Sequence, residues 1–219
     1  ISLELDITPN RPDAFSHQGV ARDIACATGR TFAPLIVEPV PSDEIQSLSI
    51  SMENEVDCPR YIGGIVKNIQ VGPSPAWIVE RLKAAGQRSI NNIVDISNYV
   101  LLEMGHPTHI FDFDCLGNKE IHVRRAKKGE SFTTLDEQKH TMDETHLLIT
   151  DGKMPVALAG IMGGLGSAVS DTTTTLLVES AYFNPVTIRK SAKSLVMSTD
   201  ASKRFERGAD PNGCETAFW

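Results

Sequence analysis

Polar and apolar residues alternate strictly over the first eight positions of the chain. Apolar side chains occupy the odd positions of residues 1–8 and polar side chains the even ones. A period of two predicts a strand with one buried face. A Pro-Asn-Arg-Pro run ends this strand, and residues 13–28 are predicted to form a helix that stops at Gly29. Residues 34–47 contain three prolines and several polar residues, which predict a linker.

Further strands are predicted where short apolar runs lie between turn signals. These runs cover residues 48–52, 61–71, 120–125, 146–150, 156–164 and 176–183. Asp151-Gly152 is a hairpin signal between the fourth run and the fifth. The last run is apolar enough for burial on both faces, although Glu179 lies in its middle.

Helix starts are marked by capping residues. Ser74-Pro75 begins a helix that ends at Gly86, and Asn184-Pro185 begins one that runs to about residue 194. Thr199 or Asp200 can cap another. Strands and helices therefore alternate irregularly. This order favours an α+β (mixed α/β) fold, with mixed sheets flanked by helices, over a doubly wound parallel sheet.

A longer helix is predicted between Ser89, as its cap, and Gly105, where it stops. This boundary places His106, Thr108 and His109 on a loop just past the helix. A loop histidine beside a Gly/Pro break is a candidate for a ligand contact or general acid–base catalysis. The alternative is a histidine that caps the preceding helix carbonyls.

Glu179 is the most unusual single residue, because a buried carboxylate must be paired or hydrogen-bonded. One interpretation is a structural ion pair, or an edge position that faces water. The other is an acceptor in a pocket wall, directed at a hydroxyl or amine of a ligand. The sequence alone leaves both open.

Composition narrows the class of protein. The 219 residues are 41% hydrophobic and 22% charged, as is usual for a soluble globular protein, and the net charge is −7. An acidic chain is not a general nucleic-acid coat protein, so any RNA contact must come from local basic patches. Two such patches are present, although runs of this kind are usually solvated surface: Arg124, Arg125, Lys127 and Lys128; and Arg189, Lys190, Lys193, Lys203, Arg204 and Arg207.

Several site classes are not expected. The four cysteines lie far apart without a CxxC pair, which excludes a typical zinc site or disulfide scaffold and indicates a reducing cytosol. His106 and His109 have no nearby carboxylate or thiol to complete a metal site. No apolar run is long enough for a membrane span, and no signal peptide is visible. Because the chain starts without Met and stops inside a predicted helix, we expect an excised fragment.

Two glycine-containing segments are candidate ligand contacts. Residues 161–166 let a ligand approach the backbone, but they lack the helix and acid of a dinucleotide fingerprint. No nucleophile-elbow signature is present. Residues 198–208 combine a helix start with Lys203, Arg204 and Arg207, a combination that suits a phosphorylated ligand.

Four segments together carry a family resemblance. They are DITPNRPD at residues 6–13, NYVLLE at 98–103 with HIFD at 109–112, AGIMGG at 159–164, and TDASKRFERG at 199–208. In order and separation they resemble the β subunit of bacterial phenylalanyl-tRNA synthetase over nearly the whole chain. The resemblance implies that residues 1–40 are the tail of a preceding domain with a linker. Residues 48–219 would then be the editing domain, truncated at its C-terminus.

The resemblance also implies an activity and its residues. In this family the module hydrolyses the ester of tyrosine mischarged onto tRNA(Phe), and the subunit works in the cytoplasm within an α2β2 tetramer. Matched motif by motif, the implied catalytic residues are His109 and Asn98, and the implied substrate-binding residues are Glu179, Gly163, Thr199 and Ala201. No cofactor is expected in this fragment, since the resemblance places ATP and magnesium elsewhere in the ligase.

This chain departs from the family pattern beside the expected pocket. His106 and Thr108 stand where Gln and Met are more usual, and Ser198 stands where His is common. These departures affect the shape of the pocket more than the activity.

Two other functions remain open on the sequence. One is a tRNA-binding or structural module without chemistry, in which Glu179 is salt-bridged. The other is a stand-alone hydrolase of free aminoacyl esters. The editing function has a physical rationale, because a site built to bind the tyrosine hydroxyl rejects phenylalanine strongly.

Overall fold

The strands of this protein form three separate sheets in the structure, a computed structural model that describes residues 3–41 and 48–219. The largest sheet has five strands in the order β1-β4-β7-β8-β9. Its first pair is parallel and the others are antiparallel. The strands are β1 (Ser49–Met52), β4 (Glu120–Arg125), β7 (Leu147–Thr150), β8 (Pro155–Leu158) and β9 (Met162–Gly163).

The second sheet is antiparallel and has β10 at its centre. Its strands are β2 (Arg60–Lys67), β10 (Thr175–Tyr182) and β3 (Thr108–Asp112). The register places Glu179 of β10 between Gly63 of β2 and His109 of β3. A two-stranded hairpin, β5 (Glu130–Thr133) with β6 (Lys139–Met142), forms the third sheet.

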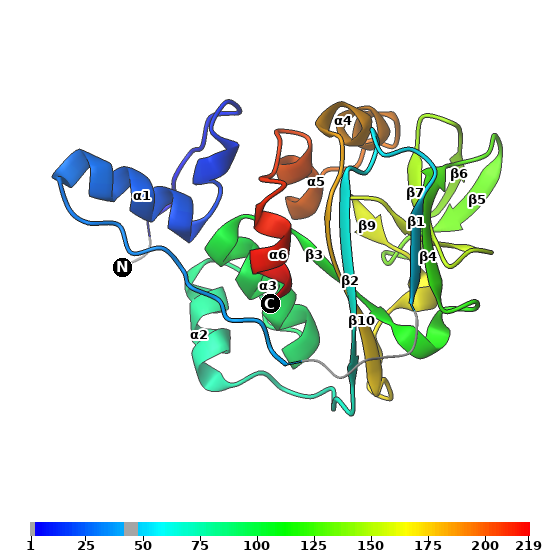
Figure 1. Ribbon diagram of the computed structural model, residues 1–219, viewed down its shortest axis with the longest axis horizontal. Helices are drawn as coiled ribbons and strands as arrows, with labels where there is room; N and C mark the ends of the chain where they lie inside the picture. Colours follow the sequence, from blue (N-terminus) through cyan, green and yellow to red (C-terminus); the bar gives the residue numbers. More distant parts are fainter. Residues whose placement is uncertain (1–2, 42–47) are drawn as a thin grey trace.

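Helices cover the three-stranded sheet on the side away from the five-stranded sheet (Figure 1). There α6 packs on β2 and β10, α3 packs on β3, and α2 packs on α3. The helices are α1 (His17–Thr28), α2 (Ala76–Ala84), α3 (Asn92–Met104), α4 (Pro185–Ser194), α5 (Asp200–Phe205) and α6 (Gly213–Phe218). Short 3₁₀ turns lie at Pro12–Ala14, Phe113–Cys115 and Leu165–Ser167.

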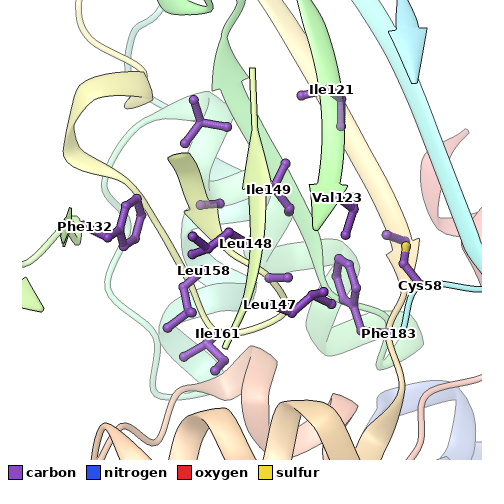
Figure 2. Packing of buried hydrophobic residues seen from close by; sticks show 14 of the residues in the cluster. Cys58, Ile121, Val123, Phe132, Leu147, Leu148, Ile149, Leu158, Ile161 and Phe183 are labelled. Carbon is purple, nitrogen blue, oxygen red and sulfur yellow. The ribbon is translucent and has the colours of Figure 1, made fainter. Parts of the chain in front are cut away.

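The hydrophobic core lies between the two larger sheets. Leu147, Leu148 and Ile149 of β7 contribute to it from one side, and Leu177 and Phe183 contribute from β10 and just beyond it. Figure 2 shows this cluster, with Phe183 on the side of Leu147. The two sheets thus share one core, and β10 forms part of the wall between them.

The two faces of β10 have different neighbours. Its odd-numbered residues face the shared core, whereas Ser180 donates a hydrogen bond of 2.8 Å to the Cys214 carbonyl in α6. A Cβ at Gly64, which pairs with Val178, would lie 2.3 Å from the Phe218 ring. Because side chains alternate along a strand, Glu179 lies on the core side.

This architecture confirms the predicted α+β class with mixed sheets. A strand lies in each predicted run from residue 48 onward, with β4 at its predicted bounds. The run at residues 156–164 forms two strands, β8 and β9, and not one, and β2 ends at Lys67, short of residue 71. The helix that ends at Gly29 and the one that follows Asn184 are also present. Asn184 caps the latter, because its side chain accepts hydrogen bonds from Val186 and Thr187.

The predicted first strand is wrong for the residues that the structure describes. Residues 3–8 are not in a strand, and Leu3 and Leu5 are 83% and 53% exposed. Residues 1–2 of that prediction lie outside the described residues. Alternation marks a half-buried strand only where a neighbouring strand supplies the ladder, and none of the described strands pairs with this segment.

The stop of α3 at Gly105 is confirmed, but its predicted start and the loop predicted after it are wrong. Asn91, and not Ser89, caps this helix, because its side chain accepts hydrogen bonds from Ile93 and Val94. Ser89 instead donates to Asp95. Past Gly105 the chain enters β3 within three residues, so His109 lies on a strand and not on a loop.

Candidate functional site

A cavity of about 60 Å³ lies between the two larger sheets and α5. Four of the residues implied by the family resemblance line it: His109, Gly163, Glu179 and Ala201. The other lining residues are Pro107, Thr108, Ile149, Ala157, Leu158, Gly160, Ile161, Met162 and Phe205. The wall is therefore mostly apolar, with one carboxyl group and one imidazole.

Glu179 is 4% exposed, and no cation pairs with it among the described residues. Its one hydrogen-bond donor in the described chain is the Tyr61 hydroxyl, 2.6 Å from Oε2. Burial raises the pKa of Glu179 to about 7, although the hydrogen bond from Tyr61 acts in the opposite direction. This carboxyl group is thus neither salt-bridged nor solvated, and it faces a cavity.

His109 lies directly opposite Glu179 in the β3–β10 ladder. Its ring packs edge-on against Phe111, with ring centroids 4.4 Å apart. Burial lowers the pKa of His109 to about 4, so the imidazole is neutral at pH 7. A neutral imidazole carries one donor and one acceptor nitrogen, which suits it to hold a water molecule.

Gly163 gives His109 the room for its ring. A Cβ at this position would lie 2.5 Å from Cε1 and 2.7 Å from Nε2 of His109. The glycines at residues 161–166 were expected to let a ligand approach the backbone. In the structure, the His109 side chain is the group that approaches the backbone at Gly163.

Thr199 and Ala201 belong to the start of α5. Thr199 forms a capping box with Ser202, and its hydroxyl donates to the Ile161 carbonyl at 2.9 Å. That bond ties α5 to the turn between β8 and β9. Ala201 lines the cavity, whereas Thr199 lines a second one beside it.

Asn98 lies in the middle of α3 and does not line this cavity. Its neighbour Ser97 hydrogen-bonds the Thr108 carbonyl and hydroxyl at 3.0 and 2.9 Å, which fixes α3 against β3. The structure thus brings together Glu179, His109, Gly163 and Ala201. Asn98 lies apart from them on α3.

Tyr61 is the site residue that the sequence analysis missed. It lies at the start of β2 and reaches Glu179 diagonally across the sheet, since it pairs with Ala181. Nothing in the local sequence marks it, because the pairing of β2 with β10 joins segments more than a hundred residues apart. The sequence shows only that Tyr61 begins an expected strand, which does not point to a role in the site.

His106, one of the departures from the family pattern, is buried against Phe205, with ring centroids 6.2 Å apart. Burial lowers its pKa to about 4. Thr108, another departure, lines the cavity. Ser198, the third, lines the second cavity.

The two arginines of the first basic patch are paired within the chain. Arg124 makes a bidentate ion pair with Glu130, at 2.9 and 2.6 Å. Arg125 pairs with Asp57, its Nε lying 2.7 Å from Oδ2. Arg124 therefore holds the five-stranded sheet to β5, and Arg125 holds it to the loop between β1 and β2.

Arg204 and Arg207 do not form a phosphate site either. Arg204 is buried and donates to the Phe15 carbonyl at 3.2 Å. Both guanidinium groups lie over the Phe15 ring, 5.2 and 4.7 Å from its centroid. They attach the N-terminal segment to α5, so the suggested binding of a phosphorylated ligand there is not supported.

A second cavity, of about 230 Å³, lies beside the first and shares Met162 with it. Its lining comes from the turn between β5 and β6 and from the loop between α4 and α5. The lining residues are Asp136, Gln138, His140, Met162, Leu195, Val196, Met197, Ser198 and Thr199.

The described residues hold neither a metal cluster nor a membrane-spanning helix. No three His, Cys, Asp or Glu side chains within residues 3–41 and 48–219 converge as a metal site would require. None of the helices in those ranges combines the length and apolar character needed to cross a membrane.

Comparison with known proteins shows the family to which this chain belongs. The model of the B3/4 domain family matches residues 57–218. The phenylalanine–tRNA ligase beta subunit of Geobacter sulfurreducens is 52% identical over 95% of this chain and 26% of its own length. That of Carboxydothermus hydrogenoformans is 48% identical over 99% of this chain and 27% of its own length.

A more distant structural likeness accompanies these matches. An N-terminal fragment of the phenylalanyl-tRNA synthetase beta-subunit from Pyrococcus horikoshii has a TM-score of 0.48 and 18% identity, covering 86% of this chain and 58% of its own. The chain spans about a quarter of the length of the curated relatives it matches. It belongs to the B3/4 domain family, in the form found in β subunits of phenylalanine–tRNA ligases.

Proposed function

We propose that the cavity around Glu179 hydrolyses the ester bond of tyrosine wrongly attached to tRNA(Phe). The observation that carries this proposal is a buried carboxyl group, free of any cation in the described chain, in the wall of an apolar cavity. An apolar wall suits an aromatic ring, and the carboxyl group suits the hydroxyl that distinguishes tyrosine from phenylalanine.

Selectivity follows from the unpaired state of that carboxyl group. Tyr61 occupies Oε2 of Glu179, which leaves Oε1 for the substrate. A carboxylate accepts the phenol proton, and the protonated acid donates to the phenol oxygen. Phenylalanine offers neither partner, and it would leave the desolvated group unsatisfied. A site of this kind discriminates by up to about 10⁴ to 10⁵.

Hydrolysis needs a placed water molecule more than a protein nucleophile. An aminoacyl ester is already reactive, so orienting water against its carbonyl supplies much of the required acceleration. His109 is neutral and lies one strand away from Glu179. We assign it the positioning of this water or of the ester.

The cavity must widen to admit the ring. Its volume of about 60 Å³ is well below the roughly 150 Å³ of an engineered cavity that binds benzene. Met162 lines the cavity and is only half-buried. An unbranched methionine with three rotatable bonds can move aside at low cost, so we expect this side chain to change rotamer on binding.

We propose that this chain acts as part of a whole phenylalanine–tRNA ligase. tRNA(Phe) and an α subunit are the proposed partners, tyrosine is the substrate moiety, and the proposed location is the cytoplasm. The four free cysteines are consistent with a reducing compartment. ATP and magnesium would act elsewhere in the enzyme.

The decisive experiment measures deacylation of Tyr-tRNA(Phe) by the Glu179→Ala variant. We expect a loss of at least about a hundredfold, because the phenol loses its partner. Glu144→Ala, which removes an exposed carboxylate, is the matched control. Unchanged deacylation by Glu179→Ala would contradict the proposed specificity.

The same assay separates the alternatives. A chain that binds tRNA(Phe) without deacylating it would be a binding module. One that hydrolyses tyrosine methyl ester as fast as Tyr-tRNA(Phe) would be a stand-alone esterase.

A second variant tests His109. His109→Ala is expected to slow single-turnover deacylation while leaving the affinity for a tyrosine analogue nearly unchanged. A wild-type single-turnover rate would leave His109 with a packing role only.

A further inference from the structure

Two distant segments of the chain meet at Phe15, which lies on neither of the two larger sheets. The guanidinium groups of Arg204 and Arg207 lie 5.2 and 4.7 Å from the centroid of the Phe15 ring. Arg204 also donates to the Phe15 carbonyl at 3.2 Å, across 189 residues of sequence. A longer hydrogen bond, of 3.5 Å, joins Arg207 to the Ile7 carbonyl. The segment before α1 is therefore bound to α5 and to the turn that follows it.

Arg204 depends on this contact because it is buried. It is 6% exposed, and its Nε lacks a hydrogen-bond partner within the described residues. Within its own helix it donates to the Asp200 carbonyl at 2.9 Å, and the Asp200 carboxylate is 3.8 Å away. Outside α5, its hydrogen-bond and ring contacts in the described chain are all to Phe15. A cation removed from water needs partners, and an aromatic face is one of them.

The other side of Phe15 is anchored on α3. Nδ1 of His17 lies 2.9 Å from the Leu102 carbonyl, near the end of that helix. A Cβ at Gly105, which ends α3 with φ +76°, would lie 3.1 Å from Cβ of Ser16 and 3.3 Å from the Phe15 carbonyl oxygen. The segment around Phe15 thus spans the gap from the end of α3 to α5.

The position of α5 matters because this helix forms part of the cavity wall. Ala201 and Phe205 line the cavity around Glu179. The helix has only six residues, so contacts with its neighbours, and not its own hydrogen bonds, decide where it lies. Its start is fixed by the hydrogen bond from Thr199 to the Ile161 carbonyl. Its other end is fixed by the arginine contacts with Phe15.

We propose that Phe15 is a positioning residue of the cavity around Glu179. It holds α5, and with it Ala201 and Phe205, where the apolar wall fits the tyrosine ring. This proposal rests on the proposed function, since it concerns the fit of the same substrate. Phe15 lies before residue 57, where the match to the B3/4 domain begins. The cavity therefore takes part of its support from a segment outside that domain.

The test uses Phe15→Leu, which keeps an apolar side chain but removes the aromatic face. In steady-state deacylation of Tyr-tRNA(Phe) by the 219-residue chain, we expect KM to rise about tenfold and kcat to stay nearly unchanged. The wall that contacts the ring moves, whereas Glu179 and His109 stay on their sheet. Phe15→Tyr keeps the aromatic face and should restore the wild-type KM. Phe32→Leu is the matched control, because Arg22 lies 5.4 Å from the Phe32 ring centroid in the same part of the chain.

Hydrogen exchange provides a second measurement that needs no substrate. The amides of α5 should exchange faster in Phe15→Leu than in the wild type, and at the wild-type rate in Phe32→Leu. Unchanged exchange in α5 would overturn the role of Phe15.

The kinetic outcomes separate this proposal from the proposed function. A wild-type KM in Phe15→Leu, or a raised KM that persists in Phe15→Tyr, would overturn the positioning role and leave the proposed function in place. If the wild-type chain does not deacylate Tyr-tRNA(Phe), the proposed function fails and the role of Phe15 in it fails as well.

Discussion

At the scale of single residues, the site depends on how one carboxyl group is held. Glu179 is desolvated by its apolar wall, which favours the protonated form, while the Tyr61 hydroxyl donates to Oε2 and favours the ionised form. These opposing effects leave a pKa of about 7. Tyr61 thus sets both the orientation and the charge of the group that we assign to substrate recognition.

Tyr61→Phe removes this donor and should raise the pKa of Glu179 above its wild-type value of about 7. The titration of the Glu179 side-chain carboxyl carbon by NMR measures this directly. Tyr182→Phe, which alters a half-buried tyrosine at the end of β10, should leave the midpoint in place. An unchanged or lower midpoint in Tyr61→Phe would refute the positioning role.

Only part of this residue-scale picture was predictable. Glu179 was recognisable as anomalous because its neighbours are apolar, but the choice between an ion pair and a pocket required the fold. Tyr61 could not be found, since its contact depends on the register between β2 and β10.

At the scale of elements, the segment before α3 is held by one buried acid. Asp95 accepts hydrogen bonds from Ser74 and Ser89, both at 2.5 Å, and from the Ile90 amide at 2.8 Å. Burial alone would raise its pKa, but these three donors lower it overall. The two serines that the sequence indicated as helix caps thus bind a side chain of the next helix.

Asp95→Asn keeps the shape of this side chain but removes its charge and turns one acceptor into a donor. We expect a loss of about 2–3 kcal/mol in the free energy of unfolding, measured in urea. Asp171→Asn, an exposed substitution, should change it by less than about 0.5 kcal/mol. Equal stability of the two variants would contradict the role given to Asp95.

Element prediction succeeded where a cap or a turn is local. Asn184-Pro185, Gly29 and the Asp151-Gly152 hairpin lie where expected. It failed for β3, whose five residues directly follow a helix stop, and for the β5–β6 hairpin, which was not predicted. Both are short, and their pairing partners are not visible in the local pattern.

At the scale of the whole molecule, buried ionisable groups give stability two opposing pH dependences. His106 and His109 have pKa values of about 4, below their unfolded value of 6.5, so stability falls as the pH drops from 6.5 towards 4. Glu179 has a pKa of about 7, above its unfolded value of 4.5. Its contribution to the free energy of unfolding is fully present below pH 4.5 and is lost as the pH rises to 7.

Between pH 6.5 and 4.5 the carboxyl group therefore offsets part of the acid sensitivity of the two histidines. Glu179→Gln removes this offset, so unfolding free energy should fall more steeply with acid, by up to about 1.4 kcal/mol per pH unit more than in the wild type. Urea unfolding at pH 6.5, 5.5 and 4.5 measures the slope, with Glu144→Gln as the control. Identical slopes would exclude a raised pKa at Glu179.

The class of fold was predictable because strands and helices alternate irregularly along the chain. The packing of the two sheets against each other was not, since it depends on contacts between distant segments. The N-terminal segment also depends on distant contacts. Its apolar and polar residues alternate as in a strand, but no described strand pairs with it.

The alternation of β10 has a consequence for how this site can vary. One neighbour of Glu179, Ser180, points the opposite way and bonds to α6. Inserting one residue ahead of Glu179 would exchange these two directions, turning the acid towards the helix layer and removing the carboxyl group from the cavity wall. A point substitution changes one side chain of the pocket. An insertion of odd length in this strand would remove the carboxyl group from the cavity even though every residue is retained.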